Sequence, residues 1–132
     1  MSSKRKVKDS LQNLRKATDK LESALQIPVD RELVMEGTTQ RFEVTVELVW
    51  KTLQRALEYE GIHPKTPRET LKRAFSTGWL DDEIVWQDLL DKRNVTSHEY
   101  LDEEFIEKNY TEIQKIFPYI KILLEFLEEK YK

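Results

Sequence analysis

The chain has 132 residues, of which 39% are hydrophobic and 36% charged, with a formal net charge of −3 at pH 7. This length and apolar content predict a single domain, residues 1–132, built around one core. Three Gly and four Pro are too few for the tight turns of a β-sandwich or barrel, and the lack of Cys excludes disulfides and thiolate metal sites.

The two histidines, His63 and His98, cannot make a histidine-rich metal site within one chain, and no Gly-rich phosphate loop is present. We therefore expect no metal and no cofactor. No apolar run approaches the roughly 20 residues that cross a bilayer, and the basic start is not followed by an apolar segment. These features predict a cytoplasmic protein that does not enter membranes.

The charges are unevenly distributed along the chain. Residues 1–20 carry seven Lys or Arg against two Asp, whereas residues 101–132 carry eight acids against five bases. Such asymmetry is most often a set of solvated helix faces. A basic surface for RNA or phosphate is the alternative.

The first predicted element is a helix over about residues 6–26, ending near Pro28. Its apolar stripe recurs every three or four residues, as a helix buried along one face requires. The members of this stripe are Val7, Leu11, Leu14, Thr18, Leu21 and Leu25.

The second element is ambiguous, because residues 42–50 alternate like a strand and also fit a helix. The helical pattern continues to Gly61 without a turn, so we predict a helix over about residues 31–60 with Gly61 ending it. Val44 and Leu48 fall outside its apolar arc. They suggest a second interface, most simply with another subunit.

The third predicted helix covers about residues 67–77 and begins with Thr66 as its cap, Pro67 in the first turn and Glu69 completing a capping box. Its inward-facing residues are expected to be Leu71, Ala74 and Phe75, and Gly78 should end it.

The fourth predicted helix covers about residues 82–96, with Asp81 as its cap. Its apolar arc contains Val85, Trp86, Leu89 and Leu90. Arg93 falls in the middle of this arc, where an arginine needs a specific reason.

The last helix is predicted to begin after Asp102, with Leu101 and Ile106 forming a hydrophobic staple and Pro118 kinking it. Tyr119 and Phe126 lie outside its main apolar face and again suggest an oligomer surface. The elements together predict an all-α fold, an up-and-down bundle of four long helices with one extra short helix. The expected apolar face of the last helix comprises Phe105, Ile106, Tyr110, Ile113, Ile116, Phe117, Ile120, Leu123, Leu124 and Leu127.

The residue types with chemical potential gather between residues 91 and 100. Arg93 can bind a phosphate through its guanidinium fork, and His98 titrates near neutral pH and can move a proton. Asn94 and Tyr100 complete the set. Cleavage of RNA by its own 2′-hydroxyl needs such a base and such a cation, and needs no metal.

Structural roles account for the same residues. Arg93 can form an interfacial ion pair with Asp88 or Asp91, His98 can cap a helix, and Asn94 can end one. From composition and spacing alone, the chain is a helical bundle without an assigned activity.

Three segments resemble one known family. Gln40–Lys51 resembles the central helix of the nucleotidyltransferase substrate-binding protein family, a member of the wider HEPN group. Thr66–Glu69 with Ala74-Phe75 and, most clearly, Asp91–Asn94 with His98–Tyr100 match it as well. The resemblance covers roughly residues 8–130.

The resemblance implies a homodimeric bundle whose partner is a separate minimal nucleotidyltransferase. Many HEPN domains resemble metal-independent ribonucleases with an Arg-x(4–6)-His motif, which Arg93 and His98 satisfy, and Asn94 stands where a polar residue commonly follows the arginine. In toxin–antitoxin pairs the motif extends to Arg-x4-His-x-Tyr. Tyr100 would then be the residue to which the partner adds AMP.

Arg93 and His98 are five residues apart, so on one continuous helix they would point about 140° apart. Either the helix ends near Asn94 or the site is built by two subunits around a two-fold axis. A monomer with full activity would contradict the second arrangement.

The expected function is that of a substrate-binding subunit that works with a minimal nucleotidyltransferase. The alternative is a ribonuclease toxin that this partner neutralises. A purely structural dimer is the third function that the residues leave open. The substrate of the first two is a nucleotide or RNA. The chain lacks the paired acidic motif of a nucleotidyltransferase and is not expected to be that enzyme itself.

Overall fold

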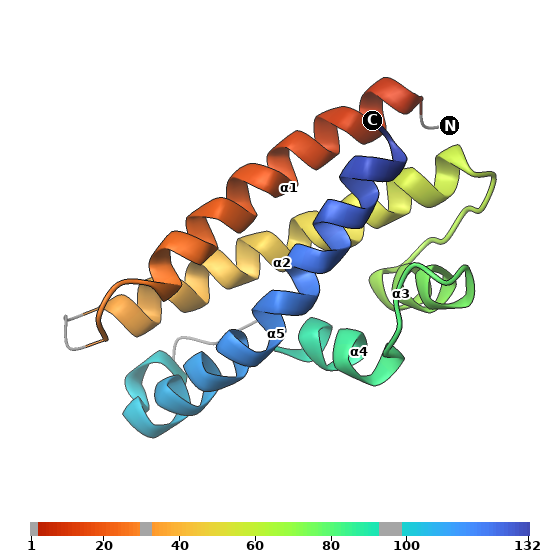
Figure 1. Ribbon diagram of the computed structural model, residues 1–132. Helices are drawn as coiled ribbons and strands as arrows, with labels where there is room; N and C mark the ends of the chain where they lie inside the picture. The colour runs from red at the N-terminus through yellow and green to blue at the C-terminus, as the bar shows by residue number, and fades with distance from the viewer. Residues whose placement is uncertain (1–2, 30–32, 93–98) are drawn as a thin grey trace.

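The computed structural model describes residues 3–29, 33–92 and 99–132 (Figure 1). Within these ranges the chain is all-α, as predicted, and contains no strand. The elements are α1 (Lys4–Leu25), α2 (Val34–Tyr59), α3 (Pro67–Ser76), α4 (Glu83–Asp91), the 3-10 helix η1 (Glu99–Leu101) and α5 (Glu103–Lys130).

Three long helices form the main body of the fold. Figure 1 shows α1 and α2 side by side and antiparallel, with α5 packed against both. The two short helices pack on one side of this trio, α3 on α2 and α4 on α3, and Leu71 and Trp86 join the same core. No described helix combines the length and the apolar character that crossing a bilayer requires.

The predicted apolar stripes make the core. On α1 every member of the stripe is buried except Leu25, which is partly buried. The segment that also alternates like a strand is helical, and Phe42, Val46 and Val49 are at most 1% exposed. A helix prevails here because its apolar arc continues for four turns against both neighbours.

Buried hydroxyls within the core are satisfied locally. Thr18 donates to the carbonyl of Leu14 at 2.7 Å, and Thr45 donates to the carbonyl of Arg41 at 2.8 Å. This bond to the preceding turn lets a threonine replace an apolar residue on a buried helix face.

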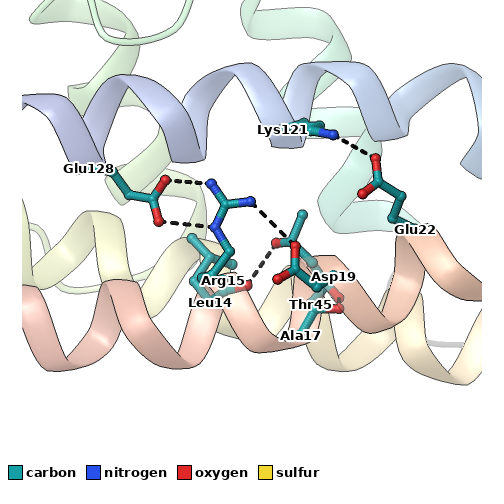
Figure 2. Close-up of polar contacts among 9 residues, drawn as sticks. Leu14, Arg15, Ala17, Asp19, Glu22, Thr45, Lys121 and Glu128 are labelled. Carbon is teal, nitrogen blue, oxygen red and sulfur yellow. Dashed lines mark hydrogen bonds and ion pairs between the residues drawn. The ribbon is translucent and has the colours of Figure 1, made fainter.

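Two ion pairs connect α1 to α5 across the surface (Figure 2). The guanidinium of Arg15 donates from Nε and Nη2 to the two carboxylate oxygens of Glu128 at 3.0 and 2.5 Å. Lys121 donates to Glu22 at 2.6 Å. The hydrogen bonds to Glu128 raise the pKa of Arg15 above its ordinary value, and the bond to Glu22 raises the pKa of Lys121.

The helix ends largely follow the local rules, with two corrections. Thr66 accepts from the N–H of Glu69 at 3.1 Å, as predicted, but the Glu69 carboxylate accepts from the N–H of Lys65 at 3.3 Å rather than from Thr66 itself. The cap of α4 is Asp82, which accepts from Val85 at 3.3 Å, and not Asp81.

Both predicted glycine stops are confirmed. Gly61 has φ +89° and Gly78 has φ +87°, the left-handed conformation that glycine adopts without a Cβ clash. Asp102 caps α5 by accepting from Phe105 at 3.2 Å, also as predicted. The helix α5 continues through Pro118 to Lys130.

Several outward positions differ from the expectation. Phe75, predicted to face inward, is 38% exposed, and Leu101 is 82% exposed, so it forms no staple with the buried Ile106. Val44 is 53% exposed as predicted, whereas Leu48 packs half-buried against the core.

The two aromatic residues that lie outside the main face of α5 also differ in exposure. Tyr119 is half-buried against the core. Phe126 is 42% exposed and its ring lies 6.4 Å from that of Trp79. Ile122, three residues after Tyr119, is 68% exposed, so apolar surface remains on this side of α5.

The helix α4 is shorter than predicted. It ends at Asp91, and the backbone N–H of its C-cap, Lys92, donates to the carbonyls of Asp88 and Leu90. The predicted helix is therefore wrong at Lys92, and its residues 93–96 lie outside the described residues. The described part of the bundle has three long and two short α-helices.

Candidate functional site

The predicted site lies between α4 and α5, and most of it falls outside the described residues. Arg93, Asn94 and His98 belong to that part. The backbone of Tyr100 belongs to η1. The described structure therefore provides the two ends between which the motif runs.

The described residues fix the two ends of this segment. The helix α4 ends at Asp91 and η1 begins at Glu99. The prediction that Arg93 and His98 converge, within one chain or around a two-fold axis, lies outside the described residues.

The acids considered as structural partners of Arg93 already pair with other cations. Lys92 donates to Asp88 at 2.7 Å, and Arg68 donates to Asp91. Arg68 also donates to Gln87 at 3.0 Å, which fixes α3 against α4. The predicted ion pair of Arg93 with either acid lies outside the described residues.

A cavity of about 400 Å³ adjoins the motif. It is bounded by the end of α4, the start of η1 and the first turns of α5. This volume is within the range of small-molecule sites. Its lining residues are Asp91, Lys92, Glu99, Phe105, Lys108, Asn109 and Glu112.

Asn109 is the unusual member of this lining. It is only 5% exposed, and among the described residues its side-chain nitrogen is the one buried side-chain polar atom without a hydrogen-bond partner. Leaving a buried donor unpaired costs about 1–3 kcal/mol, so such groups are rare in folded proteins. An unpaired amide beside a cavity marks a place where a ligand can supply the missing acceptor.

The described lining of the cavity carries charges of both signs. It includes three carboxylates, those of Asp91, Glu99 and Glu112, and two lysines, Lys92 and Lys108, and Asp91 is paired with Arg68. Lys92 is already paired with Asp88. In the parts of the chain that the structure describes, no group of three His, Cys, Asp or Glu side chains is placed to hold a metal ion.

Sequence reasoning did not identify Asn109, although the sequence contains an indication. Asn109 lies three residues after Ile106 and four before Ile113, both of which are buried on the apolar face of α5. A polar side chain at that register faces the interior. Phe105, predicted for the same face, is half-buried in the cavity wall.

The fold and the site define a helical-bundle domain whose polar motif connects two helices beside a small cavity. The chain belongs to the family described as "Nucleotidyltransferase substrate binding protein like", whose model matches residues 9–129. This confirms the resemblance stated from the sequence.

Two further comparisons agree with this assignment. The chain is 28% identical over 111 residues to the "Probable ribonuclease HepT" of Haemophilus influenzae, covering 80% of this chain and 75% of that protein. It is also similar to a crystal structure of a protein from Thermus thermophilus, with a TM-score of 0.79 and 26% identity. That match covers 86% of this chain and 98% of the other.

Proposed function

We propose that this protein is a metal-independent endoribonuclease that pairs with a separate nucleotidyltransferase and acts in the cytoplasm. The observation that carries the proposal is the intact Arg93-x4-His98-x-Tyr100 sequence in a chain 28% identical to a protein named as a probable ribonuclease.

The reaction follows from the chemistry of these side chains. His98 accepts the proton of an RNA 2′-hydroxyl, whose oxygen forms a bond to phosphorus as the bond to the 5′-oxygen breaks. Arg93 holds the phosphate through its fork and stabilises the charge that develops on it, while Asn94 orients it. The departing 5′-oxygen takes a proton from an imidazolium, which a second copy of His98 supplies in a homodimer.

Tyr100 takes a regulatory role in this proposal. A nucleotidyltransferase transfers AMP from ATP to the phenol oxygen, with release of pyrophosphate and of the phenol proton. The modification places a charged, bulky group two residues from His98. It would silence cleavage by excluding RNA.

A second candidate function is favoured by the family description. Here the protein binds a nucleotide for its nucleotidyltransferase partner without cleaving RNA, and Arg93 and His98 hold the nucleotide phosphate. This function predicts a stable complex with the nucleotidyltransferase. It also predicts that Arg93→Ala weakens the binding of the nucleotide.

The test is an RNA cleavage assay in EDTA with the full chain and its His98→Ala variant. The expected result is cleavage by the parent protein and a loss of at least about 100-fold in the variant, the usual contribution of a general base. His63→Ala is the matched control, because His63 is the other histidine and is exposed between α2 and α3. Its activity should equal that of the parent.

A well-folded parent protein that leaves RNA intact would contradict the ribonuclease and favour the nucleotide-binding role. The mass in solution tests the dimer separately. Full activity in a monomer would exclude a catalytic role for a second His98.

A further inference from the structure

The cavity beside the motif has features that the proposed cleavage chemistry does not use. Asn109 contributes nothing to proton transfer or to phosphate binding in that scheme, yet its buried side-chain nitrogen has no acceptor within the described residues. The cavity and its aromatic wall also remain unexplained. A planar ligand group that accepts a hydrogen bond would account for all three observations.

We propose that the cavity between α4 and α5 binds a nucleobase, with Asn109 reading its edge and Phe105 packing on its face. The base belongs either to RNA or to a free nucleotide. The assignment of a polynucleotide rests on the proposed function, whereas the base site itself rests on the cavity.

The lining suits a base better than an isolated phosphate. The described wall of the cavity of about 400 Å³ includes an aromatic ring, that of Phe105, and a buried amide, that of Asn109. A half-buried phenyl ring provides a stacking surface, and stacking on aromatic rings is how proteins hold unpaired bases.

The amide of Asn109 matches the remaining requirement. An asparagine side chain offers a donor and an acceptor side by side, the arrangement that pairs with two adjacent groups on a base edge. Rotation about its Cβ–Cγ bond brings either atom to the cavity. At the rim, the ammonium group of Lys108 can reach a ligand oxygen.

The test measures binding of the four ribonucleoside 5′-monophosphates and of ribose 5-phosphate to the full chain by calorimetry. Ribose 5-phosphate keeps the sugar and phosphate and lacks the base. At least one monophosphate should bind about tenfold more tightly than ribose 5-phosphate. Asn109→Leu should abolish that difference and leave the affinity for ribose 5-phosphate unchanged.

Two controls separate a base site from a structural effect. Gln114→Leu makes the same polar-to-leucine change at an exposed position of α5 and should leave the tenfold preference intact. Phe105→Leu keeps the site apolar but removes the stacking ring, and should weaken only the monophosphates. Thermal denaturation of each variant establishes that it is folded.

Cleavage of RNA measured on the same proteins distinguishes the two proposals. Equal affinities for ribose 5-phosphate and all four monophosphates would overturn the base site, even if RNA is cleaved. A base preference that needs Asn109 in a protein that does not cleave RNA would establish the site for free nucleotides and contradict the ribonuclease. Asn109→Leu could instead change the oligomeric mass in solution and leave every nucleotide affinity unchanged. The amide would then have a structural role, and the base site would be overturned.

Discussion

The contact between α1 and α5 and the cavity between α4 and α5 involve the same long helix. They differ in whether the polar side chains of α5 have hydrogen-bond partners. Against α1, Glu128 is held by two nitrogens of Arg15, and Lys121 pairs with Glu22 (Figure 2). Near α4, the buried amide nitrogen of Asn109 has no partner among the described residues.

This difference separates the roles of the two halves of α5. The half packed on α1 satisfies its polar groups, as selection for stability alone requires. The half beside the cavity retains an unpaired donor at a cost in stability. Proteins retain an unpaired buried polar group mainly where a ligand or a reaction uses it.

The largest expected effect is a loss of stability where α1 packs in the core. Leu14 is fully buried on α1, so Leu14→Ala should lower the free energy of unfolding by about 2–5 kcal/mol through lost burial and a residual cavity. Urea denaturation measures it. The exposed neighbour provides the control, and Asn13→Ala should change stability by less than about 0.5 kcal/mol.

A loss of less than about 1 kcal/mol in Leu14→Ala would show that α1 does not pack as described, because a fully buried leucine costs more than that on truncation.

The next expected effect is a gain in stability, in the half of α5 beside the cavity. Asn109→Leu should raise the free energy of unfolding by about 1 kcal/mol, because it removes an unpaired buried donor and adds apolar contact. The midpoint of thermal unfolding should rise by about 4 °C. Gln114→Leu, exposed on the same helix, should shift it little. Destabilisation of the kind expected for Leu14→Ala would instead show that the amide is paired.

The smallest effect concerns the ion pair of the stable half. A double-mutant cycle of Arg15→Met and Glu128→Gln should give a coupling of about 0.5–1 kcal/mol, because the side chains are 34% and 35% exposed and water screens them. The coupling should fall in about 1 M salt. A value above about 2 kcal/mol would show that the pair is more deeply desolvated than its exposure indicates.

The sequence by itself determined the elements whose causes are local. The helical periods, the caps at Thr66 and Asp102 and the stops at Gly61 and Gly78 depend on residues a few positions apart, and all of them are observed. Membership of the family followed in the same way, from short segments in a fixed order.

The tertiary structure alone decided which side chains meet. Arg68 pairs with Asp91 across 23 positions, Phe75 and Leu101 are left outside the core, and Asn109 is buried without an acceptor among the described residues. Each of these depends on how the helices pack on one another, and α4 ends at Asp91, earlier than predicted. A pattern within one helix specifies the face that is buried, but the partner helices determine what that face contacts.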